Sequence, residues 1–249
     1  ERIDAALDGC DAIIHLAAQA GVRASWGKAF DQYARSNVVG TQRLVEWASR
    51  SDARFVFVSS SSVYGSADAG AFREDQVLAP GSPYGVSKIA GEQLTLLYGR
   101  ESGLPVVVVR PFSVFGPRER PDKAIQRFLL AAAGDRKVHV NGDGSQERDF
   151  TYVGDIVDGL IRAMTNPPSG EVINLCRGRS LSLNRILVAV QTVTETELDI
   201  TYGPRAAGDV EVTLGDATKA KALLGFEAST DLETGVRKQW EAIRAYAAG

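Results

Sequence analysis

Short apolar stretches alternate with longer helical patterns along the first half of the chain, and this alternation limits the folds open to it. Strands are predicted at Ala12–Leu16, Arg54–Val58 and Pro105–Val109. Helices are predicted between and after them, at Asn37–Arg50 and Tyr84–Glu101. Strands that alternate with helices favour a parallel sheet covered by helices on both faces. We therefore expect an α/β fold with a doubly wound parallel sheet.

The second half of the chain shows a looser pattern. Helices are predicted at 124–133, 153–165, 183–193, 216–224 and 232–246, and strands at 137–140, 171–175 and 198–202. Ser182 precedes one of these helices and should cap it, because a serine hydroxyl accepts a hydrogen bond from a free N–H of the first turn. We expect a sheet domain over 1–116, to which the strand near 171–175 returns, and a smaller lobe that takes up most of 117–249.

Tyr84 and Lys88 lie four residues apart on a predicted helix, so they share one face about one turn apart. An ammonium group stabilises a phenolate, so we expect Lys88 to lower the pKa of Tyr84 below its usual value of about 10. Tyr84 would then serve as a general base or acid near neutral pH. The strand Phe55–Val58 ends in Ser59–Ser62, and such sheets bind ligands where their strands end. A solvated helix face and a polar loop are the alternative interpretations.

Composition and charge argue against several classes of protein. With 249 residues and 44% hydrophobic content, the chain can bury a full core. Its net charge of −3 gives no electrostatic case for binding nucleic acid or an anionic membrane. No stretch reaches the roughly 18 apolar residues of a membrane span, and no signal peptide opens the chain. We expect Cys10 and Cys176 to be buried or half-buried thiols of a cytoplasmic protein. Two histidines, His15 and His139, are too few to anchor a metal cluster.

Seven ordered motifs carry a family resemblance. They are His15–Gln19, Asn37–Thr41, Ser60–Gly65, Tyr84–Lys88, Arg110–Arg118, Gly142–Gln146 and Arg148–Val153. In this order they resemble the extended short-chain dehydrogenase/reductase family, in its branch of NAD-dependent nucleotide-sugar epimerases and dehydratases. The resemblance is closest to UDP-glucuronate and UDP-glucose 4-epimerases. It implies a Rossmann domain that binds the dinucleotide over 1–116 and a lobe that binds substrate over most of 117–249.

The resemblance also implies roles for individual residues. Tyr84 would take the proton from a sugar hydroxyl, Lys88 would hold the nicotinamide ribose of NAD, and Ser60 would steer the proton. Further cofactor contacts are implied for Leu16, Ala17, Ala18, Asn37 and Phe112. Contacts with a UDP-sugar are implied for Ser60, Ser61, Ser62, Tyr84, Ser113, Arg120, Arg127 and Arg148, where the arginine fork suits a diphosphate.

Several of these residues have alternatives. Asn37 would instead cap its helix if that helix began there. Arg205 lies one residue further from Gly208-Asp209 than the family's usual arginine, which leaves its role open. Arg23 is expected to shape the sugar pocket.

Ser61 and Ser62 bear on the reaction. Dehydratases that resemble this chain carry an acidic pair at these positions, because elimination of water needs a base and an acid. Two serines favour 4-epimerisation through a 4-keto intermediate. UDP-glucuronate decarboxylation or 4,6-dehydration on the same fold is the first alternative, and a noncatalytic dinucleotide-binding protein is the second. Arg120 is expected near the carboxylate of a hexuronate, and UDP-glucose or UDP-galactose is the neutral alternative substrate.

The beginning of the sequence also leads to an expectation. Glu1 to Leu7 resembles the end of a helix, and the chain holds no Gly-x-x-Gly-x-x-Gly. In proteins that resemble it, that loop holds the cofactor pyrophosphate. We expect the sequence to lack the first strands of the sheet and to bind dinucleotide weakly by itself. By resemblance we also expect a homodimer, formed through the helices Asn37–Arg50 and Tyr84–Glu101.

Overall fold

A four-stranded parallel sheet organises one half of the structure. The structure is a computed structural model that describes residues 2–51, 53–65, 70–165, 168–205 and 210–247. The strands run in the order β1 (Ala12–His15), β2 (Arg54–Val58), β3 (Val106–Pro111) and β7 (Glu171–Leu175). β-branched and aromatic residues fill β2 and β3, and both are almost wholly buried, as strands covered on two faces must be. The predicted α/β fold with a parallel sheet is confirmed.

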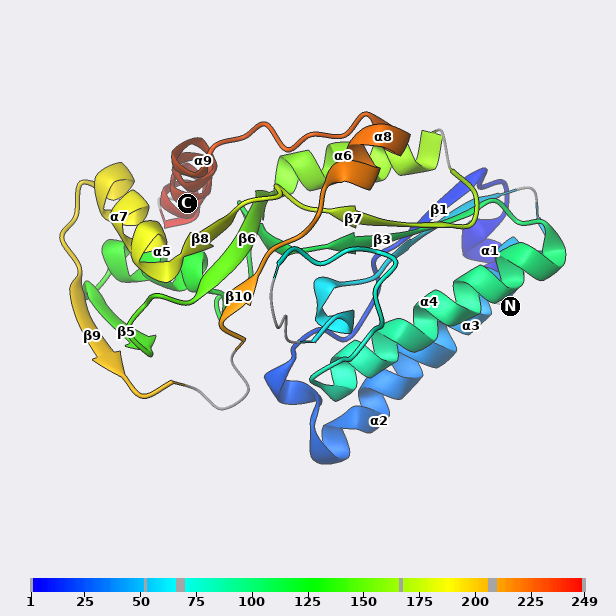
Figure 1. The fold of residues 1–249 in the computed structure, drawn as a ribbon, viewed down its shortest axis with the longest axis horizontal. Coiled ribbons are helices and arrows are strands. Elements are labelled where there is room, and N and C mark those ends of the chain that lie inside the picture. The colour runs from blue at the N-terminus through cyan, green and yellow to red at the C-terminus, as the bar shows by residue number, and fades with distance from the viewer. Residues whose placement is uncertain (1, 52, 66–69, 166–167, 206–209, 248–249) are drawn as a thin grey trace.

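Helices cover both faces of this sheet (Figure 1). α3 (Gly40–Ala48) and α4 (Pro83–Ser102) lie side by side on one face, and α6 (Val153–Thr165) and α8 (Thr218–Leu224) lie on the other. A Cβ atom at Gly91 of α4 would lie 2.4 Å from the Phe57 ring, so glycine allows this helix to approach β2 closely.

The helix predicted from Asn37 begins earlier. Helical backbone starts with α2 (Phe30–Tyr33) and continues through a π-helical segment, Ala34–Val39, into α3. Asn37 lies inside that segment, so the interpretation of Asn37 as a helix cap is wrong. Its side chain is buried and bonded to neighbouring elements, and such tertiary contacts stabilise the wider turn in a way that local sequence does not reveal.

The second half of the structure holds a mixed sheet and a strand pair. β4 (Ser113–Phe115), β6 (Glu147–Tyr152) and β10 (Val212–Thr213) are parallel, and β8 (Ser180–Ser182) pairs with β6 in antiparallel fashion. β5 (Lys137–Asn141) pairs with β9 (Asp199–Gly203). The helices α5 (Ala124–Ala133), α7 (Leu183–Thr194) and α9 (Leu232–Ala247) pack around an apolar core with these strands. Ser182 caps α7 as predicted, accepting a hydrogen bond from the Arg185 N–H at 3.2 Å.

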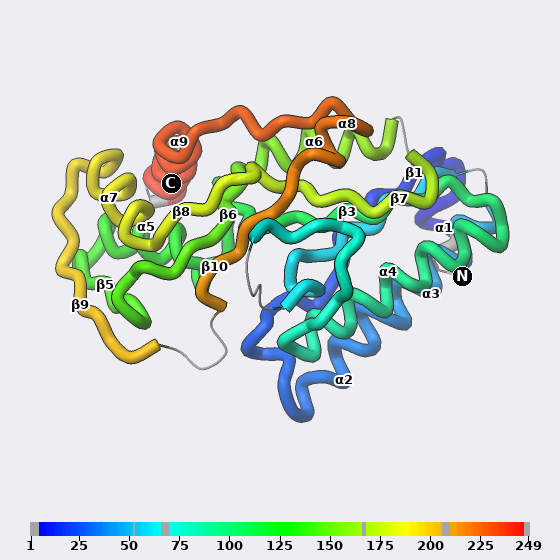
Figure 2. The backbone as a smooth tube through the Cα atoms, viewed as in Figure 1, coloured from blue at the N-terminus to red at the C-terminus, as the bar shows by residue number. Residues whose placement is uncertain are grey.

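The chain crosses between the two halves more than once. After β10 it runs to α8 above the first sheet and then returns along the top to α9 (Figure 2). β7 pairs with β3, and α6 and α8 share an apolar core with β2 and β3. Beyond residue 117, therefore, two helices pack on this sheet in addition to the one strand that was predicted to return to it. The remaining helical pieces are α1 (Arg2–Leu7) and the 3₁₀ turns Arg23–Ser25, Gly27–Ala29 and Ser61–Val63.

Two further expectations concern the burial of the two cysteines and helices long enough to cross a membrane. Cys176 is buried as expected, but Cys10 is exposed, because it lies in the turn that precedes β1 rather than within the strand. Within the described residues, every helix is too short or too polar to cross a membrane.

Candidate active site

Ser60 and Tyr84 meet where β2 ends and α4 begins. Ser60 follows β2 in extended conformation, and its hydroxyl accepts a hydrogen bond from the Ser62 N–H at 3.2 Å. Ser82 caps α4 by accepting from the Gly85 N–H at 3.2 Å, which starts the helix at Pro83. A Cβ atom at Gly85 would lie 2.5 Å from the Ser62 carbonyl oxygen, so glycine lets the first turn of α4 approach the serines. The Ser60 hydroxyl lies near enough to the Tyr84 phenol to lower its pKa, and it also donates to Ser62 Oγ at 3.1 Å.

Lys88 lies one turn further along α4 and is buried. Its Nζ donates to the Val58 carbonyl oxygen at 2.6 Å and lies 4.5 Å from the centre of the Phe57 ring. Burial lowers the pKa of Lys88 to about 8, against an opposing effect of the Glu92 carboxylate. The ammonium group is therefore fixed at the C-terminal edge of the sheet, beneath the end of β2.

The expected depression of the Tyr84 pKa by Lys88 is wrong for this structure. Burial raises the pKa of Tyr84 above its ordinary value, and this effect exceeds the lowering by the Ser60 hydrogen bond and by the charge of Arg120. Lys88 is directed toward the Val58 carbonyl. The Tyr84 phenol is thus protonated at neutral pH in the protein alone.

Replacing Lys88 by Met should change stability in a pH-dependent way. The folded-state pKa of about 8 lies below the ordinary lysine value, so the folded protein gives up this proton before the unfolded chain does. Burying the charge therefore costs stability at pH 7, and the cost fades as pH rises through 8 toward 10. We expect Lys88→Met to raise the free energy of unfolding at pH 7 by up to about 3 kcal/mol, with little gain at pH 10.

Urea unfolding at the two pH values measures this difference. Lys221→Met, at a side chain that is 67% exposed, is the matched control and should show no such pH dependence. An unchanged gap between Lys88→Met and the unsubstituted protein from pH 7 to pH 10 would contradict the buried ammonium.

A buried polar network braces the strand ends behind Lys88. The Glu92 carboxylate of α4 accepts two hydrogen bonds from Arg110 of β3, at 2.9 and 2.7 Å, and a short one from the Ser59 hydroxyl. Arg110 Nη1 also donates to the Tyr64 hydroxyl at 2.9 Å, and Tyr64 donates to Asn174 Oδ1 of β7 at 2.7 Å. The network therefore joins α4 to β3, to β7 and to the residue that follows β2.

Asn37 braces the loop that follows β1. Its Oδ1 accepts from the Gln19 N–H at 2.7 Å, and its Nδ2 donates to the Gln19 carbonyl at 3.0 Å and to Ser87 Oγ at 2.9 Å. The loop residues Leu16, Ala17 and Ala18 are exposed at the end of β1. Asn37 thus holds this loop against α4, close to Tyr84.

The Phe112 side chain is part of the core. It packs with Tyr64, Phe72 and Cys176, and its ring centre lies 6.2 Å from that of Tyr64. Ser113 follows it as the first residue of β4 and is half-buried. Ser61 and Ser62 are also half-buried, in the 3₁₀ turn after Ser60.

A cavity of about 460 Å³ lies between the two halves and gathers most of the predicted cations. Arg120 and Arg127 line it together with Arg23, and Lys123 and His139 line it as well. Contact of these arginines with a UDP-sugar stays a prediction. Arg127 Nη2 donates to the His139 carbonyl at 3.3 Å, which directs it toward β5. The lining includes neither Ser60 nor Tyr84, but the Tyr84 N–H donates to Ser25 Oγ at 3.1 Å, beside the lining residue Ala24, so the pair lies next to this cavity. The charge of Arg120 also lowers the pKa of the Tyr84 phenol.

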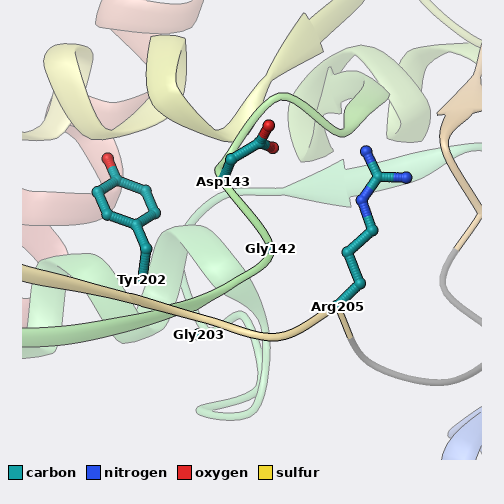
Figure 3. A pocket seen from close by; sticks show the side chains of 5 residues that line it. All are labelled: Gly142, Asp143, Tyr202, Gly203 and Arg205. Carbon is teal, nitrogen blue, oxygen red and sulfur yellow. The ribbon is translucent and has the colours of Figure 1, made fainter.

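A shallower hollow continues past Asn141. Gly142 and Gly203 form its floor, and the side chains of Asp143, Tyr202 and Arg205 rise around it (Figure 3). The positive charge of Arg205 contributes to the lowered pKa of Asp143, whose main stabilisation comes from Ser145. Gly208 and Asp209, from which the role of Arg205 was argued, lie outside the described residues.

Arg148 occupies a different position from the other predicted arginines. It lies on β6 between β8 and β10, and its Nη1 donates to the carbonyl oxygens of Glu147 at 2.7 Å and Glu211 at 3.3 Å. The lining of the cavity does not include it. Its contact with a diphosphate stays a prediction.

Sequence reasoning missed some residues that the structure brings to the site. Lys123 and His139 line the cavity, and Glu92 holds Arg110 behind Lys88. The signal for Glu92 was present, since it stands four residues after Lys88 on the same helical face. His139 had no signal, because its place depends on how β5 meets α5.

Comparisons with known proteins agree with this geometry. The family described as NAD dependent epimerase/dehydratase matches residues 1–176. A Bacillus subtilis (strain 168) protein described as an uncharacterized UDP-glucose epimerase, YtcB, is 38% identical over 94% of this chain and 74% of its own. A UDP-glucuronate 4-epimerase of Thermodesulfobacterium geofontis is 38% identical over 91% of this chain and 70% of its own.

A solved structure has a closely similar fold. The UDP-glucuronic acid 4-epimerase of Bacillus cereus, in complex with UDP-glucuronic acid and NAD, superposes with a TM-score of 0.93 and 34% identity. The match covers 99% of this chain and 79% of that one. Relatives at similar identity include dTDP-glucose 4,6-dehydratases as well as 4-epimerases, so sequence identity does not separate the two reactions.

Proposed function

Because this chain belongs to the NAD dependent epimerase/dehydratase family, we propose that it catalyses the 4-epimerisation of a UDP-sugar. The observation that carries this proposal is the set of groups around the Tyr84 phenol. The side chains that shift its pKa in the described part of the chain are those of Ser60, Arg120 and Tyr33, none of which carries a carboxyl. The half-buried turn after Ser60 holds Ser61 and Ser62, which carry none either. Elimination needs a second acid–base pair beside the reacting sugar, whereas epimerisation needs one.

The residues at the sheet edge fit the nicotinamide end of NAD. Lys88 Nζ has three N–H groups, and the Val58 carbonyl accepts one of them, so the ammonium is able to hold ribose hydroxyls. The small, exposed Ala17 and Ala18, with Leu16, allow a dinucleotide to approach the end of β1, and Asn37 fixes that loop. When bound, NAD supplies the acceptor for the hydrogen at C4 and a positive charge beside the phenol.

The residues of this chain move the proton. Positive charge beside Tyr84 lowers its pKa, so that the phenolate takes the proton from the sugar 4-hydroxyl. Ser60, whose hydroxyl lowers the pKa of the neighbouring Tyr84 phenol, orients that sugar hydroxyl. The 4-keto sugar then presents its other face, C4 regains its hydrogen, and Tyr84 returns the proton to O4. Because both hydrogens return to C4 and O4, the product differs from the substrate only in its configuration at C4.

We propose UDP-glucuronate as the substrate, because of the charge of the cavity. Its lining holds four cationic side chains and one carboxylate, Asp122. UDP-glucuronate brings a diphosphate and a carboxylate, which match this excess of positive charge, while UDP-glucose brings the diphosphate alone. Arg120 is the proposed partner of the sugar carboxylate, since its charge acts on the Tyr84 phenol and its guanidinium pairs with the exposed, easily replaced Asp122 at 3.0 Å.

Arg120→Ala tests this assignment. We expect kcat/KM for UDP-glucuronate to fall by about 10²-fold and that for UDP-glucose to change by less than about threefold, because a charge-assisted bond of about 2–3 kcal/mol is lost for one substrate only. Arg100→Ala, at a 69% exposed side chain far along α4, is the control. An equal fall in kcat/KM for both substrates would show that Arg120 does not recognise the carboxylate.

Proton NMR of the product tests the reaction. Incubation with UDP-glucuronate should give its 4-epimer, and UDP-glucose, if accepted, should give UDP-galactose. A pentose from UDP-glucuronate would establish decarboxylation, and a 4-keto-6-deoxy sugar from UDP-glucose would establish dehydration.

We also propose a homodimer formed through α3 and α4. Val39, Val86 and Leu97 are 44%, 50% and 43% exposed on or beside these two packed helices. Apolar side chains of this size on adjacent helices favour burial against a second copy. Light scattering should show twice the chain mass, and replacing Val86 and Leu97 by Lys together should give monomers.

A further inference from the structure

Glu119 connects three elements around the cavity. It lies in the loop between β4 and α5, directly before Arg120. Its Oε2 accepts a hydrogen bond from the Gln126 backbone N–H of α5 at 3.2 Å and another from Gln239 Nε2 of α9 at 2.9 Å. Gln239 is fully buried and also donates to Gln126 Oε1 at 2.7 Å.

Glu119 supplies the cap that α5 lacks. Lys123 stands at the N-cap position of α5 and makes no side-chain cap hydrogen bond. Gln126 is the third residue of that helix, and its N–H belongs to the first turn, which has no partner within the helix. A carboxylate that accepts this N–H both satisfies it and complements the positive end of the helix. The cap therefore comes from the loop rather than from the adjacent residue.

The same carboxylate fixes the loop that carries Arg120. The Glu119 N–H donates to the Gly116 carbonyl at 3.1 Å, and the Lys123 N–H donates to the Arg120 carbonyl at 3.1 Å. Arg120 thus lies in a short loop held at both ends, while Arg127 extends from the helix that Glu119 caps. Both arginines line the cavity, and Glu119 itself does not.

We propose that Glu119 is a positioning residue for substrate binding, whose carboxylate fixes the Arg120 loop and the first turns of the Arg127 helix to α9. The inference rests on the proposed function, because it gives both arginines a substrate to hold. Glu119 touches no substrate in this account and acts only through the two arginines.

The charge state of Glu119 gives this role a pH signature. Burial raises the pKa of Glu119 to about 7, while Gln239, Lys123 and the Gln126 N–H act to lower it and Asp122 acts to raise it. α5 and α9 face the carboxyl with the uncharged amides of Gln126 and Gln239. Protonation below pH 7 removes the charge that strengthens both hydrogen bonds, so binding should weaken there.

An amide at position 119 keeps the geometry without the titration. Gln239 Oε1 is buried and makes no hydrogen bond within the described residues. The amide oxygen of a glutamine at position 119 can take the place of Glu119 Oε2 and accept both the Gln126 N–H and Gln239 Nε2, which leaves the bond from Gln239 to Gln126 intact. Glu119→Gln is therefore the conservative variant, and Glu119→Ala removes the cap.

Calorimetric binding of UDP-glucuronate from pH 6 to pH 8 tests the inference with the full chain. We expect Glu119→Ala to weaken binding at pH 8 by about tenfold, the loss typical of a missing cap and charge-assisted bond. Glu119→Gln should bind within about threefold of the unsubstituted protein at pH 8 and should lose the weakening below pH 7 that the latter shows. Glu241→Ala, at an exposed position two residues after Gln239, is the control and should bind unchanged.

The outcomes separate this inference from the proposed function. Failure of the unsubstituted chain to bind UDP-glucuronate would contradict the proposed function and the inference with it. If that chain binds and Arg120→Ala weakens binding, but Glu119→Ala binds normally, only the positioning role is wrong. If Glu119→Ala fails to fold, Glu119→Gln decides, because an unaltered pH profile in that variant would overturn the role of the carboxylate.

Discussion

Replacing Tyr84 by Phe should lower kcat by about 10³-fold, because the proposed proton acceptor for the sugar hydroxyl is lost. The phenol is the group that Ser60 hydrogen-bonds and on which Arg120 acts. Removing one oxygen leaves the ring and its edge-on contact with Tyr33, at 6.2 Å between centres, in place. Binding of the UDP-sugar should therefore stay within about threefold of the unsubstituted protein, so that kcat falls and KM does not.

Steady-state turnover and calorimetric binding on the same preparation measure both quantities. Tyr98→Phe is the matched control, since Tyr98 lies on α4 as well and its hydroxyl accepts from Gln42 at 3.0 Å, away from the cavity. It should keep full turnover. A Tyr84→Phe variant that works within tenfold of the unsubstituted rate would remove Tyr84 from the chemistry.

Replacing Glu92 by Leu should destabilise the fold by about 3–5 kcal/mol, the cost of leaving a buried partner charge unpaired. Glu92 and Arg110 have side chains that are 0% and 4% exposed, and their ion pair measures 2.7 Å. Loss of the carboxylate leaves the Arg110 guanidinium with the Tyr64 hydroxyl and ring, and leaves the Ser59 hydroxyl without its acceptor. Urea denaturation at pH 7 measures the change in the free energy of unfolding.

The double variant Glu92→Leu with Arg110→Met distinguishes an unpaired charge from a packing defect. Removing both charges together should restore most of the stability that the single change costs. Glu46→Leu is the exposed control, because its pair with Arg50 has side chains that are 43% and 68% exposed and should contribute less than about 1 kcal/mol. A double variant no more stable than the single one would contradict the ion-pair account.

The strands and the proximity of Ser60 to Tyr84 were predictable from local sequence. β-branched runs such as Val106–Val109 are stable only where two faces are covered, so the parallel sheet follows from composition and alternation. Ser60 follows one strand and Tyr84 lies in the first turn of the next helix, and topology brings both to the same edge of the sheet. The sequence also shows two serines, Ser61 and Ser62, after Ser60. It therefore favours epimerisation, which needs one acid–base group, over elimination, which needs a second.

Other features depend on tertiary contacts that no short segment encodes. The helix around Asn37 begins at Phe30 because Gln19 and Ser87 hold Asn37 in a π-helical turn. The effect of Lys88 on Tyr84 was misjudged because sequence spacing gives proximity along a helix, whereas burial decides the sign of the pKa shift. Nothing in the local sequence distinguishes Glu119 from an ordinary charged surface residue. Its role follows from the packing of α9, which brings Gln239 to the Glu119 carboxylate.

The fate of the hydrogen at C4 tests the central claim most directly. UDP-glucuronate and UDP-glucose labelled with deuterium at C4 should be incubated with the protein and NAD, and their products examined by proton and deuterium NMR. A single acid–base residue that removes and returns one proton at O4 predicts 4-epimers that keep the deuterium at C4 and the original hydrogen at C5. Deuterium found at C6 of a 4-keto-6-deoxy sugar, or a pentose product, would contradict it.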